Sequence, residues 1–239
     1  IPSYRRPNIK NASGPYSDEM GKVDLVDLIV GSEGIFGLIT SATFRLKEMP
    51  DGFLDLFFTL PTEVQAVKFH NYISNYYKGN LSQITALEYF GYNCQTYMDH
   101  KEELFKNAFE VGIYLQIPLY NQTVEEIAED WLKVLSNSNC EIHEERILLL
   151  NNPRNWRTFF EARHSMPANA LKKTRQLDTL SILTDTIVPP EKFQELLDFA
   201  HTFLQESEIE YLLFGHLGDC HLHFHLIPTQ NQQSRALEI

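Results

Sequence analysis

Histidines crowd the stretch FGHLGDCHLHFHLIP, which spans residues 214–228. Of the nine histidines in the chain, four lie within ten consecutive residues of this stretch. If 221–227 is a strand, three of them share one face: His221, His223 and His225. His216 lies on the preceding loop, which neighbouring glycines keep tight. Neutral imidazoles that converge from a strand and a loop can bind a transition metal, so the stretch predicts either a metal site or a solvent-facing polar strand face.

Two neighbours of these histidines have side chains that could take part in the same chemistry. Asp219 could supply the carboxylate that such a metal site often includes. Cys220 next to His221 offers a nucleophile and a base. Because adjacent residues on a strand point to opposite faces, the sequence argues against this dyad.

Arg163 is a candidate for binding an acidic substrate. A guanidinium can hold a carboxylate by two parallel hydrogen bonds, which a lysine cannot do. Arg163 lies in a mixed segment, 151–178, in which apolar residues precede several basic ones. The alternative interpretation is a surface arginine in a charged connecting segment.

The sequence GSEGIFG has a glycine at every third position: Gly31, Gly34 and Gly37. It matches neither the dinucleotide-binding turn of a Rossmann fold nor a P-loop. Glycines at this spacing let backbone N–H groups approach a ligand closely, most often a phosphate. The alternative is an ordinary tight connection between two elements.

The composition excludes several classes of protein. With 239 residues, 43% hydrophobic and 22% charged, the chain can bury a core, which argues against disorder. A net charge of -12 at pH 7, without a block of Lys or Arg, argues against nucleic acids and anionic membranes as partners. No apolar run is long enough for a transmembrane segment. The three widely spaced cysteines form no disulfide framework, so we expect a cytoplasmic protein; peripheral association with a membrane stays open.

Alternating strands and helices would position these residues. Apolar alternation or β-branched runs predict five strands, at 54–60, 111–119, 180–188, 209–214 and 221–227. Helices are predicted after Thr62 and Thr123, which open capping boxes with Gln65 and Glu126. A third helix is predicted to begin near Phe193. This order predicts the α+β class: a ferredoxin-like antiparallel sheet with helices on one face.

The first 50 residues follow a different pattern. Residues 24–30 are apolar enough for a short buried element, and 38–46 are rich in β-branched residues and predict a strand. Pro50-Asp51-Gly52 is a turn signal, so we expect a domain boundary there.

Three stretches, in the correct order along the chain, resemble the FAD-linked oxidase family with the vanillyl-alcohol-oxidase type of flavin fold. DLIVGSEGIFGLITSATFRLKEMP resembles the end of its FAD-binding domain, and TDTIVPPEKFQELLDF resembles its Asp-x-x-Val-Pro segment and the helix that follows. GHLGDCHLH resembles its Gly-His-x-Gly-Asp-Gly-Asn-x-His motif. The most similar subgroup is that of the D-2-hydroxy-acid dehydrogenases: D-lactate dehydrogenase, the glycolate oxidase FAD subunit and D-2-hydroxyglutarate dehydrogenase. Two positions depart from the family pattern, because Cys220-His221 replaces Gly-Asn and Ile35-Phe36 replaces Thr-Leu.

The resemblance implies a division of the chain and a set of FAD contacts. Residues 1–50 would be the C-terminal part of the FAD-binding domain, and 51–239 a truncated substrate-binding cap domain of the FAD-linked oxidase C-terminal type. The cofactor-binding positions would be Gly31, Ser32, Glu33 and Gly34, together with a looser match at Lys10, Asn11, Ser13 and Gly14. The family's first flavin-binding subdomain and its later Glu-His-Gly motif match no part of the chain, so we expect a fragment or a split gene product.

The resemblance also implies the activity, the oxidation of a small D-2-hydroxy acid such as lactate, glycolate or 2-hydroxyglutarate. Arg163 would hold the carboxylate, and His216 and His223 would bind a divalent metal, Zn or Mn, at the substrate hydroxyl. A hydride from C2 would pass to FAD. Electrons would leave to a quinone, a cytochrome, an electron-transfer flavoprotein or an iron–sulfur subunit, and a homodimer is a further option.

Two other functions stay open from the sequence. A metal-dependent hydrolase could use the histidines without any flavin. The chain could also be a non-catalytic cap module that binds a partner subunit.

Overall fold

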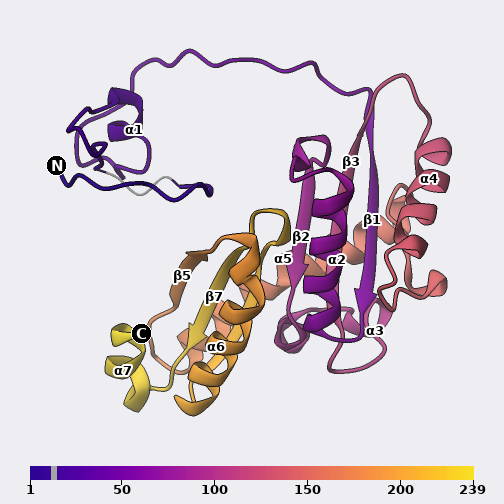
Figure 1. The fold of residues 1–239 in the computed structure, drawn as a ribbon. Coiled ribbons are helices and arrows are strands. Elements are labelled where there is room, and N and C mark those ends of the chain that lie inside the picture. Colours follow the sequence, from indigo (N-terminus) through magenta and orange to yellow (C-terminus); the bar gives the residue numbers. More distant parts are fainter. Residues whose placement is uncertain (12–14) are drawn as a thin grey trace. The chain divides into compact units, whose positions relative to one another are not determined.

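The computed structural model describes residues 1–11 and 15–239, and its main feature is a seven-stranded sheet (Figure 1). The strand order is β4-β1-β3-β2-β6-β7-β5, and every neighbouring pair is antiparallel. The strands are β1 (Gly52–Leu60), β2 (Ala86–Phe90), β3 (Val111–Leu119), β4 (Leu148–Leu149), β5 (Ile182–Ile187), β6 (Glu210–His216) and β7 (His221–Ile227).

The first half of this sheet has the ferredoxin-like order of elements. Strands β1 to β4 alternate with α2 (Glu63–Tyr76) and α4 (Val124–Asn137) as βαββαβ, with the short helix α3 (Lys101–Leu104) inserted before β3. The second half adds β5, α6 (Phe193–Glu206), β6 and β7, and ends in α7 (Gln233–Glu238). The predicted α+β class with an antiparallel sheet is confirmed.

The helices begin near the predicted capping residues. Thr123 and Glu126 close a complete capping box at the start of α4. At the start of α2, Thr62 accepts a hydrogen bond from the backbone of Gln65, but the Gln65 side chain donates to Glu141 instead of returning to Thr62. The predicted box at Thr62 is therefore only half formed, because a distant carboxylate competes for the amide.

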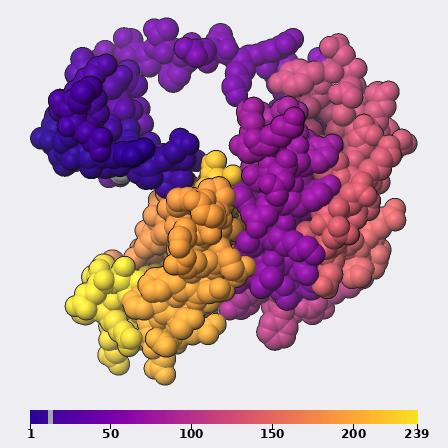
Figure 2. Space-filling model, viewed as in Figure 1, coloured from indigo at the N-terminus to yellow at the C-terminus, as the bar shows by residue number. Residues whose placement is uncertain are grey.

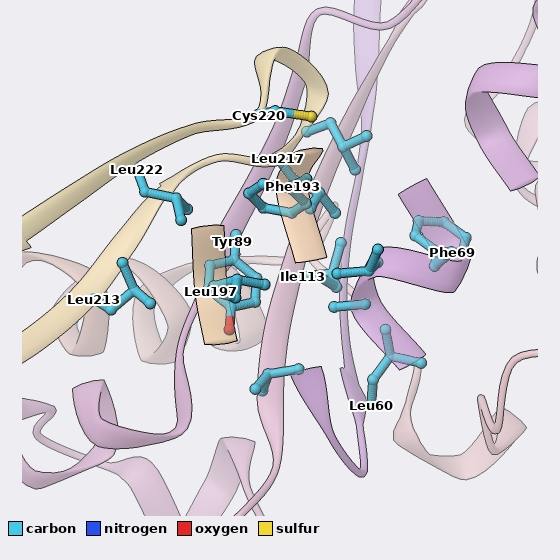
Figure 3. Packing of buried hydrophobic residues seen from close by; sticks show 14 of the residues in the cluster. Leu60, Phe69, Tyr89, Ile113, Phe193, Leu197, Leu213, Leu217, Cys220 and Leu222 are labelled. Carbon is cyan, nitrogen blue, oxygen red and sulfur yellow. The ribbon is translucent and has the colours of Figure 1, made fainter. Parts of the chain in front are cut away.

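One hydrophobic cluster lies between the sheet and α2, α4 and α6. The predicted alternation holds, since Leu54, Leu56, Phe58 and Leu60 of β1 all belong to this cluster. Figure 3 shows part of it, with Phe69 of α2 and Phe193 and Leu197 of α6 near the strand residues Tyr89 and Ile113. In Figure 2 the surfaces of α6 (orange), α2 (purple) and α4 (pink) cover this side of the sheet.

A second cluster on the opposite face corrects the prediction of helices on one face only. The segment 151–178, which had no clear pattern, forms the long helix α5 (Pro153–Gln176). Phe159, Ala162, Met166 and Ala170 of this helix pack on Phe57 and other residues of the second face. Arginine and lysine side chains on its solvent side hide the apolar stripe in the sequence, which is why the helix was missed.

Residues 1–49 form a separate compact unit. Its one helix within the described residues is α1 (Leu25–Ile29), and Arg6 forms an ion pair with Asp27 at 2.9 Å. The element predicted at 24–30 exists but buries none of its side chains. The strand predicted at 38–46 is wrong: no described strand pairs with this segment, and a strand without a hydrogen-bonded neighbour does not form a ladder. None of the described helices is long and apolar enough to cross a membrane.

Burial makes His70 of α2 a source of acid sensitivity. Its side chain is 1% exposed, and burial lowers its pKa despite hydrogen bonds with Asn71 and the Gly218 backbone. The unfolded chain therefore binds this proton more readily than the folded chain. The contribution of the buried, neutral His70 to the free energy of unfolding is complete above the ordinary histidine pKa of about 6.5. It is lost as the pH falls toward the lower pKa of His70 in the folded state.

We expect the free energy of unfolding to decrease between about pH 7 and pH 5, with a slope of at most about 1.4 kcal/mol per pH unit from this one group. Urea unfolding across this range, compared between the native sequence and His70→Gln, measures that slope. The exposed His143 provides the control His143→Gln. Equal slopes for the native sequence and His70→Gln would contradict the assignment.

Candidate functional site

The site is built on the α5 face of the sheet, where the strands β2, β6, β7 and β5 lie side by side. His216, the last residue of β6, lies directly opposite Glu88 of β2 in the strand register. The two side chains are joined by a hydrogen bond of 2.8 Å between His216 Nδ1 and Glu88 Oε1. Glu88 is largely shielded from solvent, with a side chain that is 16% exposed. A carboxylate only accepts hydrogen bonds, so Nδ1 of His216 carries the proton.

His223 of β7 is held in the same way by a second carboxylate. Its Nδ1 is in hydrogen-bonding contact with Asp185 Oδ1, and Asp185 is the residue opposite His223 on the edge strand β5. Partial burial raises the pKa of Asp185, but the hydrogen bonds and charges of His223 and His221 outweigh it, so that the pKa lies below its ordinary value. Asp185 is therefore ionised at neutral pH, and the Nδ1 of His223 carries the proton.

These two contacts determine what the two imidazoles present to each other. With Nδ1 protonated, the neutral ring has a lone pair on Nε2. The Nε2 atoms of His216 and His223 face each other at 3.4 Å. Two lone pairs at this separation repel unless a cation or a proton lies between them. Nitrogen ligands on a tetrahedral zinc are about 3.3 Å apart, so this spacing fits a divalent metal. A carboxylate behind each imidazole is also the kind of partner that metal-binding histidines usually have.

His221 completes the cluster. It lies opposite His216 in the strand register, and its Nε2 is 3.4 Å from the Asp185 carboxylate. Its ring centroid is 5.3 Å from that of His216 and 4.7 Å from that of His223. Each of the three residues offers a ring nitrogen, and the three nitrogens lie within 4.8 Å of one another.

The turn between β6 and β7 brings the histidines together. The chain reverses through a short helical turn, Leu217–Asp219, and Cys220 adopts the left-handed conformation with φ 51°. Gly215 allows the two strands to approach closely, because a Cβ there would lie 2.2 Å from the His221 carbonyl oxygen. Cys220 stands where the resembling motif has glycine, and its conformation is one that glycine adopts without strain. A glycine at this position could therefore adopt the same backbone conformation.

Neither Asp219 nor Cys220 belongs to the candidate metal-binding group. The carboxylates beside the histidines are Glu88 and Asp185, and Asp219 is not one of the three residues whose ligand atoms lie close together. Cys220 is fully buried on the opposite face, and burial raises its pKa to about 12, so its thiol is not a nucleophile at neutral pH.

His225 shares the strand face with His221 and His223 but has a structural environment. Its side chain is buried, and its Nε2 is 2.6 Å from Ser181 Oγ. Burial lowers its pKa, so the ring is neutral. The three-histidine strand face predicted from the sequence therefore contains two residues of the cluster and one that is hydrogen-bonded inside the protein.

Arg163 lies on α5 above the same face of the sheet. Its charge acts on Tyr114 of β3: burial and the neighbouring Asp55 raise the pKa of Tyr114, and Arg163 opposes this rise. The Tyr114 hydroxyl donates to Asp55 Oδ1 at 2.6 Å. Tyr114 is also the register partner of Glu88, which holds His216. Arg163 thus lies on the same face of the sheet as the histidine cluster, and its charge acts on a residue next to the strand that carries Glu88.

A family model described as "FAD linked oxidases, C-terminal domain" matches residues 95–239, which include Arg163 and the whole histidine cluster. The chain belongs to the FAD-linked oxidase family.

One curated relative of this FAD-linked oxidase chain is the D-lactate dehydrogenase of Anaerostipes hadrus. The two are 24% identical over 217 residues, which are 87% of this chain and 43% of the relative. The chain therefore spans less than half the length of that protein.

Solved structures with a similar fold include two enzymes. An alkyldihydroxyacetonephosphate synthase has a TM-score of 0.58 at 15% identity, covering 88% of this chain and 43% of that chain. A p-cresol methylhydroxylase with substrate bound has a TM-score of 0.53 at 8% identity, covering 79% of this chain and 42% of that chain. At these identities the similarity shows the fold alone.

The residues predicted to bind FAD lie in the unit 1–49. Gly31, Ser32, Glu33 and Gly34 form successive tight turns, closed by a hydrogen bond from the Ile35 amide to the Ser32 carbonyl at 3.0 Å. Gly34 has φ +85°, and the space beside it is open, so its backbone can be approached by a ligand. The loop thus fits contact with a cofactor. Lys10 and Asn11 lie in the same unit, whereas Ser13 and Gly14 fall outside the described residues.

Sequence reasoning missed both carboxylates of the site. Glu88 lies 128 residues before His216, and no motif connects them. Asp185 is marked in the sequence as the first residue of the Asp-x-x-Val-Pro segment, but the segment does not indicate which residue it contacts. Only the pairing of β5 with β7 shows that its partner is His223.

Removal of the Glu88 carboxylate tests whether this residue supports metal binding through His216. Glu88→Gln should weaken Zn²⁺ binding by about 10- to 100-fold, because the imidazole of His216 becomes less basic and less well oriented. Isothermal titration of the metal-free protein with Zn²⁺ measures the effect. Glu125→Gln, an exposed substitution on α4, is the matched control. An unchanged affinity in Glu88→Gln would remove Glu88 from the site.

Proposed function

We propose that this chain is part of an FAD-dependent dehydrogenase that oxidises a small D-2-hydroxy acid to the 2-oxo acid. In this proposal, residues 1–50 are the C-terminal part of the FAD-binding domain, and 51–239 are the substrate-binding cap domain. The family membership and the D-lactate dehydrogenase relative support an oxidoreductase of this class.

The observation that carries the proposal is the pair of imidazoles whose Nε2 atoms face each other at 3.4 Å, with a carboxylate behind each ring. This pair lies on the same face of the sheet as the helix that carries Arg163. A 2-hydroxy acid has a carboxylate and a hydroxyl group to be bound. A guanidinium can bind the carboxylate, and a metal held by two imidazoles can bind the hydroxyl.

Each residue has a role that follows from its chemistry. Arg163 would pair with the substrate carboxylate and orient the acid. His216 and His223 would hold a divalent metal, which lowers the pKa of a bound hydroxyl. Glu88 and Asp185 keep the protons on Nδ1, so that both Nε2 atoms stay available as ligands. Gly31 and Gly34 would help to hold FAD, which would supply the hydride acceptor for the oxidation.

Reduction of the flavin by substrate tests this function. The native protein that contains this chain is purified, and the absorption of its oxidised flavin is followed without oxygen after addition of D-lactate, glycolate or D-2-hydroxyglutarate. Bleaching by one of these acids, and not by the L-enantiomer of a chiral one, is the expected result. A native protein without flavin, or a flavin that none of these acids reduces, would exclude the proposal.

The metal-dependent hydrolase is the second candidate, and the histidine cluster is the observation in its favour. Three partly exposed imidazoles, of which that of His216 is the most exposed, resemble a catalytic metal site with an open position. Hydrolysis of an ester by the flavin-free, zinc-loaded chain, abolished in His216→Ala, would support this function instead. A purely non-catalytic cap module would show neither flavin reduction nor hydrolysis.

A further inference from the structure

We propose that His221 is a third protein ligand of the metal centre, so that this chain supplies a complete three-imidazole set from one β-hairpin and its turn. The inference rests on the metal centre of the proposed function and adds to it the residue at which the chain departs from the family motif.

The placement of His221 supports this role. The β6–β7 register sets His221 directly opposite His216, and cross-strand neighbours on one face have Cβ atoms about 5 Å apart. His223 follows two positions later on the same strand face, so the three rings form a compact triangle. Their ring nitrogens lie within 4.8 Å of one another, and His221 is as shielded as His223, each with a side chain that is 17% exposed.

Like the other two imidazoles, His221 has a carboxylate beside it, although it faces Asp185 with Nε2 rather than Nδ1. Asp185 contacts both His221 and His223 through the same oxygen, Oδ1. A shared carboxylate orients two rings at once and makes both more basic, which is the usual arrangement behind metal-binding histidines. The narrow turn at Gly215 and Cys220 restrains the backbone that carries His216 and His221, so little ordering is required when a metal binds.

The donor set selects a class of metal. Three neutral imidazoles suit Zn²⁺ and its neighbours Co²⁺ and Ni²⁺, whereas Mg²⁺, Ca²⁺ and Mn²⁺ prefer oxygen ligands. Three protein ligands leave a fourth position of a tetrahedral ion open for water or a substrate oxygen. Of Zn and Mn, the two metals expected from the sequence, the site with His221 favours Zn.

Zinc binding by the 239-residue chain tests the proposal without flavin or substrate. The metal-free chain and the variant His221→Asn are titrated with Zn²⁺ against a chromophoric chelator. His143→Asn, at an exposed histidine away from the cluster, is the control. We expect His221→Asn to raise the Kd by about 10- to 100-fold or more, since loss of even an outer partner has an effect of this size. His143→Asn should leave the Kd unchanged.

A second measurement does not depend on how the variant folds. X-ray absorption at the zinc edge of the unmodified chain counts the coordinating imidazoles, and three are expected. Two imidazoles, or a Kd for folded His221→Asn within about twofold of the parent value, would overturn the proposal. Tight zinc binding by three imidazoles, in a protein whose flavin no 2-hydroxy acid reduces, would support this inference and exclude the proposed oxidation. Flavin reduction by such an acid without zinc binding would support the oxidation and exclude this inference.

Discussion

Replacement of Arg163 by methionine is expected to lower kcat/KM for the 2-hydroxy acid by on the order of 100-fold, because removal of one partner of a hydrogen-bonded charge pair costs about 2–5 kcal/mol. Methionine keeps the length and helix propensity of the side chain and removes only the guanidinium. Arg163→Lys should recover part of the loss, since it restores the charge without the two-pronged geometry. Steady-state kinetics of the native protein, with the variants introduced into it, measures these effects.

Arg157→Met is the matched control for this substitution, because Arg157 is an exposed arginine on the same helix, α5. It should leave kcat/KM unchanged. A related alcohol without a carboxylate should be oxidised slowly but equally by the native protein and Arg163→Met. If Arg163→Met oxidises the acid as fast as the native protein, the carboxylate is bound by another residue.

Replacement of Phe159 by alanine is expected to lower the free energy of unfolding by about 3–5 kcal/mol. Phe159 is the central residue between α5 and the sheet and is 1% exposed. Its ring centroid is 5.1 Å from those of Phe57 and Tyr114 and 6.0 Å from that of Phe90. Alanine would leave a cavity that residues from three strands cannot collapse to fill. Urea unfolding followed by circular dichroism measures the loss.

Phe199→Ala is the control for the stability measurement, since Phe199 on α6 is 65% exposed and should change the free energy by less than about 0.5 kcal/mol. Phe159 also lies one helical turn before Arg163, so the two residues occupy one side of α5. Loosening of this turn should weaken substrate binding in Phe159→Ala before the protein unfolds. A loss of stability below about 1 kcal/mol would mean that the cluster repacks and that α5 is not anchored by this ring.

Local patterns predicted most of the elements because the signals they carry are local. The apolar alternation of 111–119 needs only one buried face to produce β3, and Thr123 with Glu126 forms the start of α4 within four residues. The alternation of a strand also sufficed to suggest that the histidines converge, since it places His221 and His223 on one face, next to the loop in which His216 was expected.

Segments that depend on distant partners could not be predicted in this way. The residues 38–46 have strand propensity but pair with no described strand, and propensity without a neighbour does not make a ladder. The helix α5 was obscured because its apolar stripe is narrow and because the helix contains Pro167, which cannot donate a hydrogen bond to the Arg163 carbonyl. Packing on the second face of the sheet, rather than its own periodicity, stabilises it.

The sequence by itself determined the α+β class, the family resemblance and the histidines that could bind a metal. Only the tertiary structure decided which nitrogen of each histidine is available, because that depends on Glu88 and Asp185, 128 and 38 residues away from the imidazoles they hold. It also separated His225, which is buried against Ser181, from His221, which joins the cluster, although both lie on the same strand face. Protonation and ligand geometry are properties of neighbours in space, and the pairing of β2 with β6 and of β5 with β7 creates those neighbours.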